Sequence, residues 1–181
     1  MIEFFYDIGS PYSYLASERI EALADRTGSS VWWRPFQLAG VFRVVGADLG
    51  IKLGPQQRYM VRDLGRWAER IGVPLRFPKV FPVDTANAMR CLVLAPRPER
   101  AEISHLLFRA LWGEGKQISD REVLRDVVGV ERTARLDDGD ADVKLGRITE
   151  EAIARGAFGS PSFFVGNEFF FGEAFVFFDH T

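Results

Sequence analysis

The sequence predicts an α/β fold in which one sheet is assembled from the two ends of the chain, with a large block of helices inserted between them. Two observations lead to this prediction. Residues 2–36 have the pattern of a strand, a helix and a second strand, and residues 161–172 have the pattern of two strands joined by a tight turn. From about residue 38 to 155, apolar residues recur at helical spacing, in segments that end at Pro or Gly.

The amino-terminal unit is predicted to be a β-α-β arrangement. Residues 2–6 are rich in Phe and Tyr, as a buried strand should be, and residues 30–36 form a second apolar run that leads up to a proline. Between them, a helix is expected from Pro11 to near Gly28, because its apolar residues fall on one face. Such a short crossover implies parallel strands with a right-handed connection.

The inserted block contains several amphipathic segments, and the chain then returns to strands. The helical segments are 56–74, 85–96, 100–115 and 140–156. After them, two Phe-rich runs flank Gly166-Asn167, a two-residue turn typical of a hairpin. We therefore expect residues 1–37 and 156–181, with a flanking helix at 141–155, to form the sheet core. Residues 38–140 are expected to form an inserted helical domain.

Composition excludes several classes of function. The chain has 181 residues and a formal charge of −2, which leaves no basic field for nucleic acid and no polybasic membrane anchor. We find no apolar run of membrane-spanning length and no signal-peptide pattern, so a cytoplasmic location is expected. A single cysteine, Cys91, and two histidines argue against a disulfide and a metal site. Any chemistry must therefore use hydroxyls, carboxylates, guanidinium groups or a bound cofactor.

Two Ser-Pro motifs carry the functional argument. Ser10 precedes Pro11 at the expected start of the first helix, where an N-cap role alone would explain it. Ser160 precedes Pro161 at the start of the hairpin, where the bond is either an ordinary trans proline or a cis proline. Together with the helical insertion, the two motifs describe a thioredoxin-like fold, in which the helix N-terminus and a cis proline face each other.

The chain resembles the 2-hydroxychromene-2-carboxylate isomerases and the kappa-class glutathione transferases, which are DsbA-like proteins with serine in place of the first redox cysteine. The resemblance runs through nearly the whole chain and is carried by the segments FYDIGSPYSYLA, WRPFQLAGVFR, RYMVRDLGRWAERIGVPLRFP, FPVDTANAMR, FRALWGEG and RGAFGSPSFFVGNEFFFG. It implies a glutathione-dependent cis-trans isomerase of aromatic-compound catabolism, with glutathione and a small aromatic substrate as ligands. In that role Ser10 stabilises the glutathione thiolate.

The same resemblance, with the position of Pro161 at the start of the hairpin, predicts a cis Ser160-Pro161 bond and a Ser160 backbone that faces Ser10. It also assigns further site residues. Glutathione contacts are expected at Gln56, Ser160, Pro161 and Glu173, in addition to Ser10. Substrate contacts are expected at Arg43, Asn87 and Tyr12. Simpler interpretations remain open for several positions: Arg43 as a solvated surface residue, Asp84 and Asn87 as caps of the helix after Pro82, and Trp112 and Cys91 as core residues.

The sequence also departs from the family pattern. Ala47, Gln56 and Ala174 stand where polar or charged glutathione contacts are usual, which predicts weakened glutathione binding. Two alternatives therefore stay open: a kappa-like glutathione transferase, and a thioredoxin-fold binding protein that has lost glutathione affinity. The Phe-rich tail after Gly172 further predicts a homodimer that covers these aromatic residues.

Overall fold

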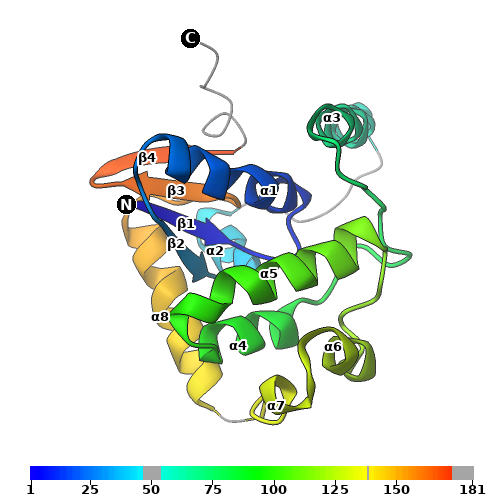
Figure 1. Ribbon diagram of the computed structural model, residues 1–181, viewed down its shortest axis with the longest axis vertical. Helices are drawn as coiled ribbons and strands as arrows, with labels where there is room; N and C mark the ends of the chain where they lie inside the picture. Colours follow the sequence, from blue (N-terminus) through cyan, green and yellow to red (C-terminus); the bar gives the residue numbers. More distant parts are fainter. Residues whose placement is uncertain (47–53, 138, 173–181) are drawn as a thin grey trace.

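A computed structural model describes residues 1–46, 54–137 and 139–172 and shows a mixed four-stranded sheet with helices on both faces (Figure 1). The strand order is β2-β1-β3-β4. β1 (Ile2–Tyr6) pairs in parallel with β2 (Val31–Pro35) and antiparallel with β3 (Ser162–Val165), and β4 (Glu168–Phe171) pairs antiparallel with β3. The predicted sheet, built from both ends of the chain with a carboxyl-terminal hairpin, is confirmed.

Alternation along the central strands divides the core into two clusters, because successive side chains of a strand point to opposite faces. On one face, the Phe4 ring stacks on Phe163 at 5.1 Å and meets Trp33 edge-on at 5.0 Å. These rings belong to the main core, which also includes residues of α1 (Pro11–Arg26) and of the inserted helices. On the other face, Phe5 belongs to a smaller second cluster.

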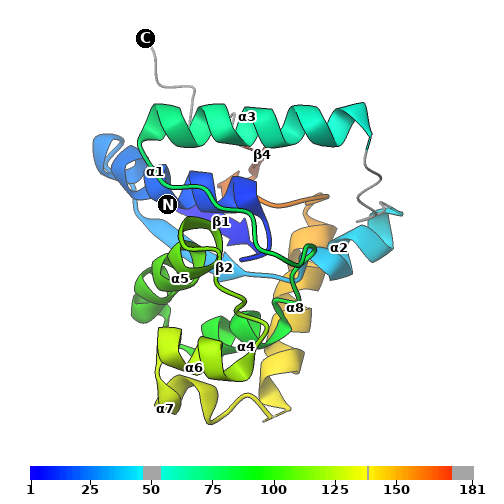
Figure 2. The same cartoon turned by 90° about the vertical axis from the view of Figure 1, so that its right-hand side faces the viewer.

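The insertion between β2 and β3 is helical, as predicted. Its helices are α2 (Leu38–Val45), α3 (Pro55–Ile71), α4 (Ala86–Leu94), α5 (Arg100–Phe108), α6 (Arg121–Val128) and α7 (Val130–Thr133). They are followed by α8 (Asp140–Ala154), the helix expected to flank the sheet. α4 to α7 lie on one side of the sheet, whereas α3 lies apart from these helices and beside α1 (Figures 1 and 2). Among the helices in the described ranges, none combines the length and the apolar character needed to cross a bilayer.

One predicted helix has a different form in the structure. The segment 100–115 is not a single regular helix, because α5 passes into one π-helical turn at Arg109–Gly113. Trp112 in this turn is fully buried, which confirms its prediction as a core residue. Wide turns of this kind occur frequently near functional sites.

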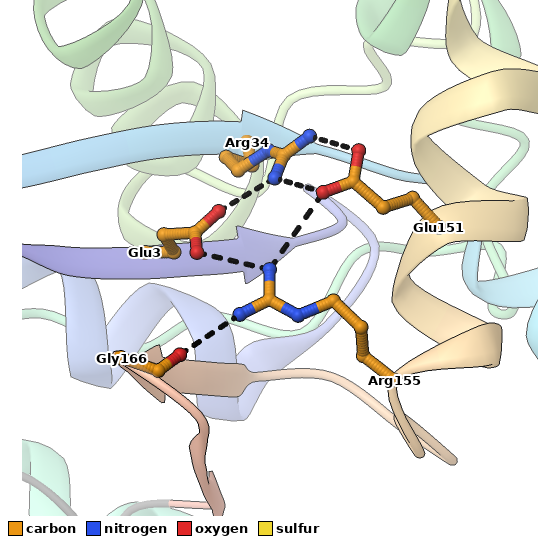
Figure 3. Close-up of polar contacts among 5 residues, drawn as sticks. All are labelled: Glu3, Arg34, Glu151, Arg155 and Gly166. Atoms are coloured by element: carbon orange, nitrogen blue, oxygen red, sulfur yellow. Dashed lines mark hydrogen bonds and ion pairs between the residues drawn. The ribbon is translucent and has the colours of Figure 1, made fainter.

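A charged cluster ties the two ends of the chain together on the sheet face that α8 covers (Figure 3). The Arg34 guanidinium on β2 donates to Glu3 on β1 and to both carboxylate oxygens of Glu151 on α8. Arg155 donates to Glu3 at 2.9 Å and to the Gly166 carbonyl in the hairpin turn at 3.3 Å. The cluster therefore joins the amino-terminal strands, the last helix and the hairpin, the parts expected to form one core.

Candidate functional site

Ser10 lies at the N-terminus of α1, in the turn that follows β1. Its backbone is extended, and its hydroxyl oxygen accepts a hydrogen bond from the Ser13 amide at 3.2 Å, so the predicted N-cap is confirmed. The same hydroxyl donates to the Ser160 carbonyl at 2.9 Å. Ser10 is 4% exposed. A polar hydroxyl is thus held at the positive end of a 16-residue helix.

The loop before β3 forms the opposite side of the site. The Ser160-Pro161 peptide bond is cis, and the Ser160 carbonyl faces Ser10, so both parts of this prediction are confirmed. The Ser160 hydroxyl lies 2.7 Å from the Ser13 hydroxyl and accepts from the Asp7 amide at 3.0 Å. One hydrogen-bonded cluster thus contains Asp7, Ser10, Ser13 and Ser160.

The inserted helices hold the backbone of the turn at Ile8. The Trp112 indole N–H donates to the Ile8 carbonyl at 2.8 Å, and the Ile8 amide points to the Met89 sulfur at 3.4 Å. Phe77 and Phe81 pack edge-on against the Trp112 ring at 5.8 and 5.9 Å. The turn that carries Ser10 is therefore fixed by both the sheet and the insertion.

A cavity of about 370 Å³ opens beside this turn, between the first residues of α2 and α4. Asp7 lies in its wall, 5% exposed, and burial raises the pKa of this carboxyl group above its ordinary value. The cavity is lined by Asp7, Gln37, Ala39, Gly40, Arg43, Pro82, Val83, Asp84, Thr85, Ala86 and Met89. A pocket of this size with a few polar groups suits a small organic ligand.

Comparison with known proteins agrees with this geometry. Residues 1–178 match the DSBA-like thioredoxin domain family. The chain is 32% identical over 186 residues to 2-hydroxychromene-2-carboxylate isomerase from Pseudomonas putida, a match that covers 96% of this chain and 89% of that protein. It is 31% identical over 178 residues to glutathione S-transferase kappa 2 from Caenorhabditis elegans, which covers 89% and 79% of the two chains.

The chain belongs to the 2-hydroxychromene-2-carboxylate isomerase and kappa-class glutathione transferase family, a family of enzymes. Solved structures agree with this assignment. A selenomethionine 2-hydroxychromene-2-carboxylate isomerase superimposes with a TM-score of 0.85 at 28% identity, over 97% of this chain and 90% of that one. The disulfide reductase DsbM from Pseudomonas aeruginosa, solved with GSH, shares the fold at a TM-score of 0.63 and 22% identity, over 93% and 87% of the chains.

Of the three residues that the family resemblance assigns to the substrate, one, Arg43, lies in the cavity wall. It is on α2 and is exposed. Asn87 is not among the lining residues; its side-chain carbonyl accepts from the Arg90 guanidinium one turn along α4. Asp84 precedes Thr85, the N-cap residue of α4, and accepts from the Ala86 amide at the start of that helix; it also lines the cavity. Tyr12 is half-buried and packs against the main core.

The remaining glutathione positions are only partly described. Gln56 lies in the first turn of α3. Glu173, Ala47 and Ala174 lie outside the described residues, as do the aromatic residues of the tail.

Sequence reasoning missed three polar residues of the site, Asp7, Ser13 and Thr85. A hydroxyl in the first turn of a helix can be satisfied locally, as at Ser13, but the Ser13 hydroxyl reaches across to Ser160. Asp7 carried a usable signal, because an acidic residue directly after a buried strand needs partners from neighbouring segments. Thr85 carried no such signal, since its partner is 78 residues away in the sequence.

Proposed function

We propose that this protein is a glutathione-dependent cis-trans isomerase of the 2-hydroxychromene-2-carboxylate type. The observation that carries the proposal is the Ser10 hydroxyl at the N-terminus of α1, directed at the Ser160 carbonyl of the cis-proline loop. The relatives support it, because three of them, at 32 to 33% identity, are named 2-hydroxychromene-2-carboxylate isomerase. We include a cytoplasmic location and a homodimer in this proposal.

The residues of this chain fit glutathione at that position. A thiolate is stabilised by the partial positive charge at a helix N-terminus and by a hydroxyl donor. When bound, glutathione supplies a thiolate that forms a C–S bond at the conjugated double bond, leaves a single bond free to rotate, and departs as the double bond re-forms. The thiol is thus neither oxidised nor consumed.

In this proposal Ser10 must redirect its only hydroxyl proton. In the structure, that proton is donated to the Ser160 carbonyl. An amide N–H of the extended tripeptide would replace it on the carbonyl, which releases the Ser10 hydroxyl to donate to the sulfur. The Ser13 amide keeps the Ser10 oxygen in place, because it donates to that oxygen from within α1.

The adjacent cavity is the proposed site for the aromatic substrate. Asp7, three residues before Ser10, lies in its wall, and Arg43 in the same wall supplies a guanidinium for a substrate carboxylate. We also propose Tyr12 as a substrate contact, because it follows Ser10 by two residues. Gln56, Pro161 and Glu173 are the proposed further contacts to glutathione.

The test is isomerisation of 2-hydroxychromene-2-carboxylate by wild type, Ser10→Ala and Ser13→Ala. We expect turnover that requires glutathione and falls by about 10²-fold in Ser10→Ala, the usual cost of one donor to a developing anion. Ser13→Ala is the matched control, which removes a neighbouring hydroxyl of the same cluster that is paired with the Ser160 hydroxyl. We expect it to lose much less activity.

The outcome of this test distinguishes the proposed isomerase from a transferase and from a binding protein. Turnover without glutathione, or full activity of Ser10→Ala at saturating glutathione, would contradict the proposal. Conjugation of electrophiles without isomerisation would indicate a kappa-like transferase, as the 31% identical relative suggests. Absence of glutathione binding at millimolar concentration by calorimetry would indicate a binding protein instead.

A further inference from the structure

Asp7, the first residue after β1, carries a buried carboxylate that joins three separate segments. Its Oδ1 atom accepts from the Gly9 amide and from the Thr85 hydroxyl, both at 2.9 Å. Its Oδ2 atom accepts from the Leu38 amide, also at 2.9 Å. The carboxylate is thus held by neutral donors that come from three different parts of the chain.

Each donor lies on a different element beside the site, and Thr85 itself lines the cavity. Gly9 is the residue before Ser10 in the turn at the start of α1. Leu38 is the first residue of α2, the helix that carries Arg43. Thr85 is the N-cap residue of α4 on the other side of the cavity. The Asp7 side chain therefore links the turn that carries Ser10 to α2 and to α4.

Only a carboxylate satisfies all three donors. It is an acceptor at both oxygens, with about four acceptor positions in total. An asparagine of the same shape has one acceptor oxygen, and its NH₂ group would face either the Gly9 amide or the Leu38 amide, both of which are donors. Burying a carboxylate is costly, and a packed fold does not require one at this place. The choice of residue is explained by the need to hold three donors together.

We propose that Asp7 is a positioning residue for the reaction, which holds the Ser10 turn and the α2 and α4 walls in register so that the substrate is presented to the sulfur at Ser10. This inference rests on the proposed function for the identity of the ligands. Asp7 touches neither the sulfur nor the double bond in this account. It acts through Gly9, Leu38 and Thr85.

The test compares Asp7→Asn, Thr85→Val and a matched control, Ser104→Ala. Ser104 shares a buried 2.6 Å hydrogen bond with the hydroxyl of Tyr6, the residue before Asp7. Tyr6 belongs to the main core, and neither Tyr6 nor Ser104 lines the cavity. Asp7→Asn should lower kcat/KM for the aromatic substrate by about tenfold or more, because a small misplacement of reacting groups is costly. Its KM for glutathione should stay within about threefold of wild type.

The other variants separate positioning from general loss of stability. Thr85→Val removes one of the three bonds and should change kcat/KM for the aromatic substrate in the same direction, to a smaller extent. Ser104→Ala should lower the melting temperature and leave both kinetic constants unchanged. Equal effects of Asp7→Asn and Ser104→Ala on kcat/KM, or an equal rise of both KM values in Asp7→Asn, would overturn the proposal. If Asp7→Asn does not fold, an unchanged kcat/KM in Thr85→Val would overturn it.

A second readout does not depend on activity. Hydrogen exchange at either the Gly9 amide or the Leu38 amide should be faster in Asp7→Asn than in Ser104→Ala, since one of these amides loses its acceptor. Unchanged exchange at both amides would overturn the role of Asp7 even if the enzyme is active. If wild type shows no glutathione-dependent turnover, the proposed function fails, and the exchange experiment still tests whether Asp7 joins the three segments.

Discussion

Replacement of Arg34 by methionine tests whether the two ends of the chain form one core. The Arg34 side chain is 6% exposed and donates to Glu3, 14% exposed, and to Glu151, 42% exposed. Its guanidinium also lies 4.5 Å from the Phe5 ring centre and 4.2 Å from that of Trp32. Methionine keeps part of the apolar contact and removes every charged hydrogen bond.

The expected loss follows from what the two carboxylates retain. Removing one partner of a fully buried ion pair costs about 3–5 kcal/mol. Here Glu3 keeps Arg155 at 2.9 Å, and Glu151 is open to water, so the loss should lie lower, at about 2–3 kcal/mol. In a chain of this size that corresponds to a fall of roughly 5–10 °C in the melting temperature.

Urea and thermal unfolding measure this loss, with Arg90→Met as the control. Arg90 makes a similar bidentate contact with Asp142, but these side chains are 28% and 54% exposed, so the loss of Arg90 should cost less than about 1 kcal/mol. A loss for Arg34→Met no larger than that of Arg90→Met would contradict the larger contribution to stability assigned to Arg34.

The pH dependence gives a second check on the same network. Arg34 holds the pKa of Glu151 below its usual value, so the folded state binds this proton less readily than the unfolded state. The stability contributed by the pair is complete above the unfolded pKa and is lost as the pH falls through the folded pKa. The difference between wild type and Arg34→Met should therefore shrink in acid; a difference that stays constant would contradict this account.

Further predictions concern the loop before Pro161 and the single thiol. A Cβ at Gly159 would lie 2.7 and 2.9 Å from two atoms of the Phe171 ring, so Gly159→Ala should cost about 1 kcal/mol, at the low end for overpacking because the ring is partly exposed. In urea unfolding, adding Phe171→Ala should remove the cost of the alanine; additive losses would refute the clash. Burial raises the pKa of Cys91 to about 11, so a thiol reagent at neutral pH should label it only in urea; rapid labelling of the native protein would contradict its buried position.

The elements and the site were predictable from the sequence to different degrees. Strands, hairpin and helical insertion follow from local patterns, and the cis bond at Pro161 was implied by its position at the hairpin together with the family resemblance. Contacts made by polar groups across large separations were not predictable, because neither partner reveals the other: Asp7 and Thr85 are the clearest case. The expected substrate contact at Asn87 lies outside the cavity, since its side chain pairs with Arg90 on the same helix.

In the proposed reaction, the Ser10 hydroxyl and the N-terminus of α1 stabilise a glutathione thiolate. The direct test is the pKa of the thiol of bound glutathione, measured from thiolate absorbance in wild type and in Ser10→Ala. Wild type should lower this pKa to below about 7.5, from about 8.5 for a free thiol, and Ser10→Ala should return it most of the way. An identical thiol pKa in the two proteins, or a wild-type value at or above that of free glutathione, would contradict the account.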